Sequence, residues 1–357
     1  MSTAEVLPVL VMGAVKHDYI LSGLAAHPRF EMLAIADDED APDWAHERNV
    51  ATAAAFGLPY VRDVGAALRQ YQPRVACVTP EVRRHAGLSV QAAEAGLHIV
   101  QDKPMALSLA DCDQVVAAVE RAGVRFLMWS RNTHPSILHA KEVLAAGDIG
   151  QPYALHVDFY FAKDAGVLLG SGEPEEVPDS WDGLGELTLE GIYPLGYIHE
   201  LLGVPVRRVF ARTTAHFFQR HADRGVEDLG SVTLEMENGI LGSLCIGRIG
   251  EPSHPNIGEL RLHILGTKGA FVVAEPRPEV SVHARGLKSG DYRQRRVGLD
   301  YERHLLDDFA HAIDSGSDTR MTARDSRAIA ATVLTAIESG QTGRPVEVPS
   351  LATAVAG

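Results

Sequence analysis

The stretch Leu97-His98-Ile99-Val100-Gln101-Asp102-Lys103-Pro104 decides the fold that we expect for this chain. Its first five residues form a short apolar run that predicts a buried strand. Proline fixes its own φ and restricts the residue before it, so Lys103 is a positioned cation at the end of that strand. Ligands of α/β proteins bind at the carboxyl edge of a parallel sheet. The stretch therefore predicts a lysine in a ligand site.

The rest of the N-terminal third repeats this pattern of a short apolar run followed by a helical segment. The predicted strands are Val9–Met12, Met32–Ala36, Val75–Thr79, Leu97–Gln101 and Phe126–Trp129. The predicted helices are Tyr19–Ala26, Trp44–Phe56, Val64–Tyr71, Arg83–Ala95 and Leu109–Ala122. Alternating units of this size call for a parallel sheet with right-handed crossovers. Residues 1–130 are therefore predicted to form a doubly wound α/β domain of the Rossmann type.

After the predicted helix Ser136–Ala146 the pattern changes to strands joined by hairpin signals such as Asn238-Gly239. We expect an α+β domain over residues 131–345 with a large, mostly antiparallel open sheet, followed by a tail at 346–357. Residues 162–188 are rich in glycine, proline and acidic residues, and this composition predicts a long irregular insertion. The predicted strands are Tyr153–Phe161, Val209–Thr214, Ser231–Glu237, Leu241–Gly247, Glu259–Gly266 and Ala270–Ala274, and the predicted helices Glu302–Asp314 and Arg324–Ser339. The second of these helices is a candidate to pack back on the first domain.

Composition limits the class of function. The 357 residues are 46% hydrophobic and 22% charged, which is ordinary for a globular protein of two domains. The net charge of −14 argues against nucleic acid and anionic membranes as partners. Three separate cysteines without a CxxC pair fit a reducing compartment, and no secretory signal or transmembrane span is evident. We expect a cytoplasmic protein.

The segment after the first predicted strand, Gly13-Ala14-Val15-Lys16-His17-Asp18, keeps only the first glycine of a G-x-G-x-x-G turn. A strand precedes it, a helix follows, and Asp37 closes the second strand. An acid there hydrogen-bonds an adenosine ribose and repels a 2′-phosphate, which favours NAD over NADP. The alternative is a surface aspartate that begins a turn. The candidate cofactor residues are Gly13, Ala14, Val15, Asp37, Thr79, Pro80, His85, Asp102 and Lys103.

A second set of candidate residues lies in the C-terminal part. Tyr193 precedes Pro194, a residue suited to the first turn of a helix that Gly203 would end. A phenol at the start of a helix is able to point into a cleft. The alternative is that it packs within the protein and makes a structural hydrogen bond. His199 lies further along the same helix and is a candidate substrate residue, with a structural role as the alternative. No histidine pair has the supporting pattern of a metal site, so no metal is expected.

Together these motifs resemble the glucose–fructose oxidoreductase / inositol dehydrogenase (Gfo/Idh/MocA) family over nearly the full length. The pieces that carry the resemblance are Asp37, Thr79-Pro80 with His85, the stretch from Ala95 to Leu107, and Gly147-Asp148-Ile149-Gly150-Gln151-Pro152. Asp102 stands where the family usually has Glu, and Tyr193 where it usually has His. Gly196 stands where the family has a second Asp. The resemblance implies catalysis by Lys103 and Tyr193 and a homodimer or homotetramer. It also places Arg131 and His134 where the last Rossmann strand meets the cleft, as candidates to contact substrate or nicotinamide, with a structural role as the alternative.

Three hypotheses follow for the function. The first is an NAD(H)-dependent oxidoreductase that acts on a secondary alcohol of a sugar, cyclitol or glycoside, with Tyr193 and Lys103 handling the proton. The second keeps the fold but takes a dihydrodiol or another non-sugar alcohol, because Gly196 alters the pocket. The third is a non-catalytic, NAD-binding, sugar-responsive regulator. The presence of both Lys103 and Tyr193 argues against the third.

Overall fold

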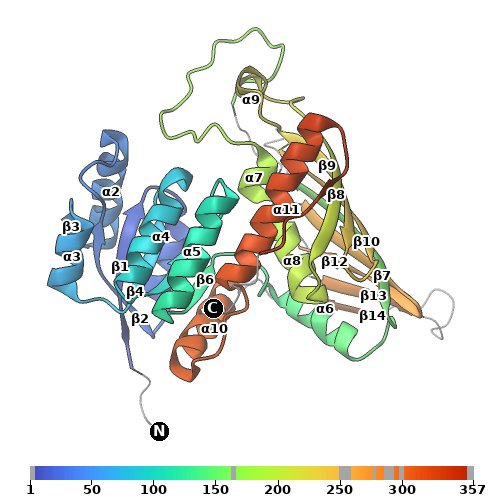
Figure 1. Ribbon diagram of the computed structural model, residues 1–357, viewed down its shortest axis with the longest axis horizontal. Coiled ribbons are helices and arrows are strands. Elements are labelled where there is room, and N and C mark those ends of the chain that lie inside the picture. Colours follow the sequence, from blue (N-terminus) through green and yellow to red (C-terminus); the bar gives the residue numbers. More distant parts are fainter. Residues whose placement is uncertain are drawn as a thin grey trace, which may run out of the picture. The chain divides into compact units, whose positions relative to one another are not determined.

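A computed structural model describes residues 5–161, 166–248, 259–275, 279–284, 293–296 and 301–351. Its contacts divide the chain into two units, each built around its own sheet (Figure 1). The first comprises Met1–Ser130 and Glu302–Ala330, and the second comprises Arg131–Tyr301 and Ala331–Gly357. Part of the C-terminal region thus belongs with the N-terminal unit.

The first unit holds a parallel sheet with the strand order β3-β2-β1-β4-β5-β6. Its strands are β1 (Leu7–Ala14), β2 (Phe30–Ala36), β3 (Tyr60–Val61), β4 (Val75–Thr79), β5 (His98–Gln101) and β6 (Phe126–Met128). The order reverses direction between β1 and β4, and this reversal is the point where doubly wound sheets bind ligands. The predicted Rossmann-like fold is confirmed.

Helices join these strands, and their ends follow the capping signals of the sequence. Ser108 accepts a hydrogen bond from the amide of Asp111 at the start of α5, and Gly123 ends that helix with φ 65°. The helices are α1 (Asp18–Ala26), α2 (Asp43–Phe56), α3 (Val64–Tyr71), the 3₁₀ turn η1 (Val82–Arg84), α4 (His85–Glu94) and α5 (Leu109–Ala122). From the C-terminal region, α10 (Tyr301–Ser315) stacks Phe309 on Phe30 of β2.

The second unit holds a mixed sheet with the strand order β14-β13-β12-β11-β7-β10-β9-β8-β15 in the residues described. Its strands are β7 (Pro152–Phe161), β8 (Val206–Thr214), β9 (Leu229–Met236), β10 (Leu241–Arg248), β11 (Glu259–Gly266), β12 (Gly269–Ala274), β13 (Glu279–Ala284), β14 (Arg293–Arg296) and β15 (Val346–Glu347). Among the described strands of this sheet, all neighbouring pairs are antiparallel except β7 with β10, which run parallel. The predicted open, mostly antiparallel sheet is confirmed.

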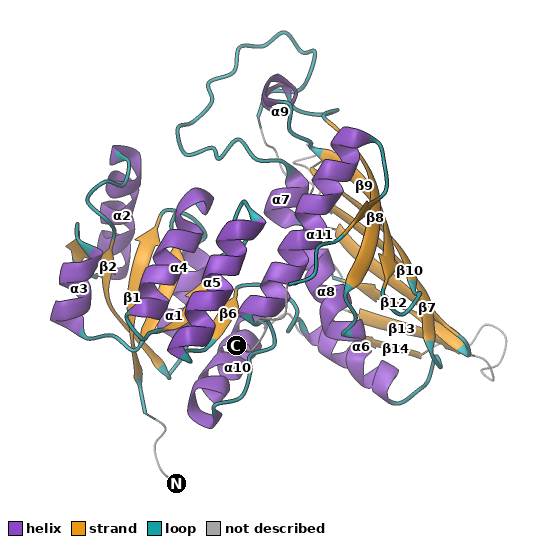
Figure 2. Ribbon diagram, viewed as in Figure 1, coloured by secondary structure: helices purple, strands orange, loops and turns teal. Residues whose placement is uncertain are grey.

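Helices cover one face of this second sheet (Figure 2). They are α6 (Pro135–Ala145), α7 (Glu186–Glu190), α8 (Ile192–Leu202) and the C-terminal half of α11 (Ala323–Thr342), with the short α9 (Gln219–Arg224) near one end. Along β7 the side chains of Leu155, Val157 and Phe159 are buried on the helix side, and the alternate residues are more exposed. This period of two is the signature of a sheet with one covered face.

Three details differ from the sequence-based expectation. Strands β13 and β14 were not predicted, and both lie next to residues outside the described ranges. Val346 and Glu347, assigned from the sequence to a tail, pair with β8 at the edge of the sheet. The expected insertion at 162–188 includes residues 162–165, which lie outside the described ranges, and its last residues already belong to α7.

Candidate functional site

The turn after β1 is shaped by close approach to the end of β4. Gly13 has φ +71°, and a Cβ there would lie 2.7 Å from the Cβ of Pro80. Only glycine satisfies both the positive φ and this contact. The amide of Ala14 donates to the Asn49 side chain at 2.6 Å, and that of Val15 donates to the Thr79 carbonyl at 3.2 Å. The Gly13–Val15 turn is therefore fixed by side-chain and backbone partners within the first unit.

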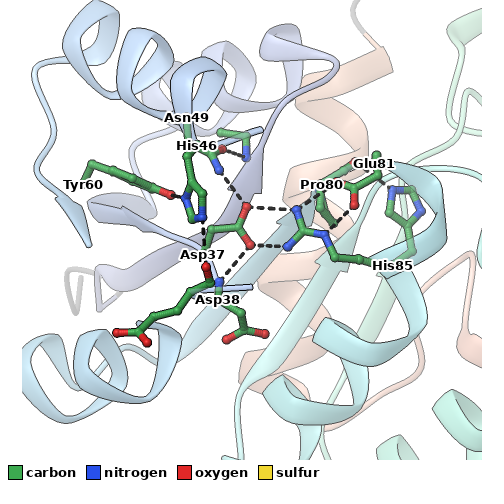
Figure 3. Close-up of polar contacts among 11 residues, drawn as sticks. Asp37, Asp38, His46, Asn49, Tyr60, Pro80, Glu81 and His85 are labelled. Carbon is green, nitrogen blue, oxygen red and sulfur yellow. Dashed lines mark hydrogen bonds and ion pairs between the residues drawn. The ribbon is translucent and has the colours of Figure 1, made fainter. Parts of the chain in front are cut away.

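Asp37 follows the end of β2, and its carboxylate is fully buried. It accepts hydrogen bonds from the amide of Asp38 at 2.9 Å and the side chain of Asn49 at 2.7 Å, and it is ion-paired with Arg84 (Figure 3). Asn49 thus links Asp37 to the glycine turn. Sequence reasoning singled out Asp37 but missed Asn49 and Arg84, because neither forms a recognisable motif with its partner.

The Asp102-Lys103-Pro104 segment lies directly after β5, as predicted, and is buried. Asp102 is 2% exposed and Lys103 is 4% exposed, and the peptide bond between Lys103 and Pro104 is cis. The Asp102 carboxylate accepts a hydrogen bond from the backbone amide of Lys103 at 2.7 Å, and it pairs with Nδ1 of His17 at 2.6 Å. Burial opposes its charge, but His17, His85 and Lys103 together hold the pKa of Asp102 below its ordinary value. An ionised acid therefore accompanies Lys103.

His85 and Thr79 form hydrogen bonds that connect the loops at the carboxyl edge of the first sheet. His85 is fully buried, with Nδ1 2.7 Å from the Pro104 carbonyl and Nε2 3.2 Å from the Pro80 carbonyl. Both partners are backbone carbonyl oxygens, so the ring lies between two acceptors. The Thr79 hydroxyl donates to the Lys16 carbonyl at 2.9 Å. Both residues hold the site's backbone in place, and a direct contact with a cofactor stays a prediction.

In the second unit, Tyr193 occupies the first turn of α8, where it was predicted. Its ring is 3% exposed, meets Phe159 edge-on at 6.0 Å, and lies under the guanidinium of Arg131 at 4.4 Å. Gly203 ends the helix with φ 61°, as the sequence indicated. His199, the third predicted substrate residue, is half-buried in the last turn of α8. The face of the tyrosine ring attracts the Arg131 cation electrostatically.

Unsatisfied polar atoms gather around Arg131. Its NH1 donates to Glu275 at 2.6 Å, and although burial disfavours its charge, Glu275 and nearby tyrosines hold the pKa of Arg131 well above its ordinary value. His134 caps α6 through Ser136, and burial lowers its pKa. Within the described residues, four buried atoms in this cluster have no hydrogen-bond partner: Arg131 Nε, His134 Nε2, Tyr197 OH and Glu275 Oε2. Buried polar atoms normally have partners, so these four indicate a position for hydroxyl groups or water.

Sequence reasoning identified Arg131 and His134 but missed Tyr197 and Glu275. Tyr197 follows Tyr193 by one helical turn, which is a usable signal for a shared face. Glu275 comes directly after β12 and carries no motif. Across the described ranges, no group of three or more His, Cys, Asp or Glu side chains is arranged to hold a metal ion, and none of the helices is long and apolar enough to cross a membrane.

The first unit fits a dinucleotide. Its strand order reverses between β1 and β4, a glycine turn joins β1 to α1, and a buried carboxylate lies beside that turn. The close approach of Gly13 to Pro80 leaves no room for a Cβ, as a turn that brings backbone to a pyrophosphate requires. In such a cofactor the Gly13 turn would hold the pyrophosphate, Asp37 the adenosine ribose, and Lys103 the nicotinamide side.

Comparisons with known proteins agree with this geometry. Residues 8–129 match the model of an oxidoreductase family with an NAD-binding Rossmann fold, and residues 137–272 match the GFO/IDH/MocA C-terminal domain. The chain is 25% identical over 338 residues to D-apiose dehydrogenase of Paraburkholderia graminis, covering 90% of this chain and 84% of that protein. It is 28% identical over 277 residues to inositol 2-dehydrogenase 2 of Saccharopolyspora erythraea, covering 74% of each.

Among solved structures, levoglucosan dehydrogenase in complex with NADH has the same fold. The TM-score is 0.80 at 20% identity, covering 97% of this chain and 100% of that one. Two family models that match successive parts of the chain, together with the Rossmann-like sheet and the open second sheet, settle its membership. The chain belongs to the Gfo/Idh/MocA family of oxidoreductases and carries that family's NAD-binding Rossmann domain.

Proposed function

We propose that this chain is an NAD(H)-dependent dehydrogenase that transfers a hydride between nicotinamide and a secondary alcohol of a sugar, cyclitol or glycoside. The observation that carries the proposal is Lys103, a 4% exposed cation fixed between Asp102 and Pro104 at the carboxyl edge of a parallel sheet. The relatives named D-apiose dehydrogenase and inositol 2-dehydrogenase support a polyhydroxylated substrate.

Oxidation of a secondary alcohol removes two hydrogens, the hydrogen on carbon as a hydride and the hydroxyl hydrogen as a proton. The nicotinamide supplies the chemistry that takes up the hydride. Tyr193 accepts the hydroxyl proton in oxidation and returns it in reduction, and the role of Lys103 is to hold the reacting hydroxyl by a hydrogen bond. Removal of hydride and proton converts the secondary alcohol to a ketone, and the reverse steps restore it.

The unsatisfied atoms near Tyr193 suit a substrate with several hydroxyl groups. A hydroxyl is both a donor and an acceptor, so it is able to pair with Glu275 Oε2 as well as with Arg131 Nε or Tyr197 OH. A site built from such atoms discriminates strongly against substrates without the matching hydroxyls, because its own groups then stay unpaired. This is the reason for favouring a sugar or cyclitol over an apolar alcohol.

The decisive experiment compares Lys103→Met with the wild-type protein in a screen of sugars, cyclitols, glycosides and cyclic diols with NAD⁺. We expect Lys103→Met to reduce kcat by about 10²–10⁴-fold, the size of a general acid–base contribution, while NAD⁺ binding stays measurable. Lys268→Met, which removes a charge from an exposed turn, is the matched control and should retain activity. Unchanged turnover in Lys103→Met contradicts the mechanism, and activity on cyclic diols alone contradicts the sugar assignment.

We also propose that the protein acts in the cytoplasm as a homodimer or homotetramer. Its three cysteines are free thiols, two of them buried, which suits a reducing compartment. On the face of the second sheet away from the helices, Leu241 of β10 and Leu265 of β11 flank Ala154 of β7 in register. These leucines are 58% and 38% exposed, and an apolar row on a sheet face favours coverage by a second copy.

A further inference from the structure

The carboxylate of Asp37 has no acceptor position left in this structure. A carboxylate offers about four lone-pair positions, two on each oxygen. Oδ1 accepts from the amide of Asp38 at 2.9 Å and from NH1 of Arg84, and Oδ2 accepts from Asn49 at 2.7 Å and from NH2 of Arg84 at 3.0 Å. Ribose hydroxyls need acceptor positions on this same group, so they compete with donors that are already in place.

Among those donors, Arg84 is the one able to leave. Asn49 also binds the amide of Ala14 at 2.6 Å, and Asp38 contributes its own backbone amide. Arg84 instead reaches Asp37 from the 3₁₀ turn η1 with a long side chain that is 21% exposed. A ribose that binds Asp37 therefore displaces the guanidinium.

A displaced Arg84 stays near Asp37 because Glu81 holds it. Nε of Arg84 donates to Glu81 Oε1 at 2.5 Å and NH2 donates to Oε2 at 2.8 Å, a second forked pair within the same turn (Figure 3). Burial works against the charge, but Glu81 and Asp37 hold the pKa of Arg84 well above its ordinary value. The side chain is therefore a permanent cation that pivots on Glu81.

We propose that Arg84 is the residue that sets cofactor discrimination, and that it allows this chain to accept NADP as well as NAD. The inference rests on the proposed dehydrogenase function and deepens it. With NAD, the ribose hydroxyls take the Asp37 positions that Arg84 vacates. With NADP, the guanidinium pairs with the 2′-phosphate, because a planar fork matches phosphate oxygens and neutralises the repulsion from Asp37. Asp37 alone predicts NAD, whereas the Asp37–Arg84 pair predicts both cofactors.

The test measures dissociation constants of NAD⁺ and NADP⁺ by calorimetry for the wild-type protein, Arg84→Gln and Arg83→Gln. Arg83 is the adjacent, exposed arginine, so its variant makes the same charge change without touching Asp37. We expect wild-type constants within about tenfold of each other, and a rise of about tenfold or more in the NADP⁺ constant of Arg84→Gln, the size of one charge-assisted contact. The NAD⁺ constant should stay level or fall, because Asp37 becomes accessible. Arg83→Gln should resemble the wild-type protein.

Two outcomes overturn the inference while the proposed function survives. One is a wild-type protein that binds NAD⁺ but discriminates against NADP⁺ by more than about a hundredfold, as an unpaired acid at this position would. The other is an unchanged ratio of the two constants in Arg84→Gln. Failure of the wild-type protein to bind any nicotinamide dinucleotide refutes the proposed function itself, and the inference with it.

A second measurement covers the case in which Arg84→Gln does not fold. Arg84→Lys keeps the charge but loses the fork, so the ratio of constants should shift in the same direction by a smaller factor. In the wild-type protein, the NADP⁺ constant should also rise more steeply with salt than the NAD⁺ constant, because one more ion pair is screened. Equal salt slopes contradict the pairing of Arg84 with the 2′-phosphate.

Discussion

Asp102 and Glu227 are both buried carboxyl groups, but their surroundings shift their pKa values in opposite directions. Around Asp102, nearby cations outweigh the burial, and the pKa lies below its ordinary value of 3.8. Around Glu227, burial is the main influence and the charge of Glu186 adds to it, so the pKa lies above 4.5 in spite of hydrogen bonds from backbone amides and the nearby His221. The first acid is held ionised, and the second is held toward its neutral form.

The raised pKa of Glu227 predicts a dependence of stability on pH. The folded protein binds this proton more tightly than the unfolded chain does, so the stabilisation is complete below about pH 4.5 and is lost as the pH rises through the folded value. Glu227→Gln keeps an oxygen for the amide of Leu187, which donates to Oε1 at 3.0 Å, but has no proton to lose. We expect its melting temperature to rise relative to wild type as pH increases from 4 to 8.

Melting curves at several pH values check this prediction, with the exposed Glu176→Gln as the control. The difference between Glu227→Gln and wild type should grow with pH, while Glu176→Gln should follow the wild-type curve. A constant difference over the whole range means that Glu227 does not titrate differently in the folded and unfolded protein.

Single residues were predictable from the sequence where a local pattern fixed both their chemistry and their place. The position of Lys103 at a strand end was predictable because an apolar run precedes it and proline follows it. The position of Asp37 was predictable because it closes the second strand after a glycine turn. Arg84 was not, because its partner Asp37 lies 47 positions earlier in the chain and the pairing needs the three-dimensional sheet. Tyr197 and Glu275 were missed for the same reason, since their common partner Arg131 is distant from both in sequence.

Whole elements were predictable where periodicity and capping agree. The α5 boundaries follow from Ser108 before the first turn and Gly123 after the last, and both features appear at those positions in the structure. Strand β13 alternates polar and apolar residues over only six positions, and β14 contains no apolar residue. Neither has a hairpin signal of the kind found at Asn238-Gly239. The parallel pairing of β7 with β10 could not be predicted from the sequence either, because it joins strands that are far apart in the chain.

The cap of α5 provides a test at this scale. The Ser108 hydroxyl accepts from the amide of Asp111 at 3.1 Å and donates to its carboxylate at 2.7 Å. We expect Ser108→Ala to lower the free energy of unfolding by about 1 kcal/mol, because an amide of the first turn loses its partner. Ser108→Thr keeps the hydroxyl and should lose much less. Denaturant titration followed by circular dichroism measures both variants, and equal losses would assign the effect to packing around residue 108.

For the molecule as a whole, the second sheet presents a face that the helices of its own unit leave open. Leu241, Ala154, Leu265 and Ala270 are aligned across four neighbouring strands on this face. The side chains that point from these strands to the opposite, helix-covered face are buried. The alternation of the sequence that identified the sheet therefore also identifies its exposed face. A single chain leaves this row exposed to water, whereas a symmetric pair of chains that packs these faces together buries the row of each chain.

The assembly is tested by placing a charge in that row. Leu241→Asp puts a carboxylate on the sheet face, and burying it without a partner costs more than the apolar contact contributes. We expect light scattering to show the mass of a dimer or tetramer for wild type and a shift toward the single chain for Leu241→Asp. Val50→Asp, a similarly exposed position on α2 of the first unit, should leave the mass unchanged. A Leu241→Asp protein with the wild-type mass would show that the chains associate through another surface, and NAD⁺ binding measured on the same sample verifies that the first unit is still folded.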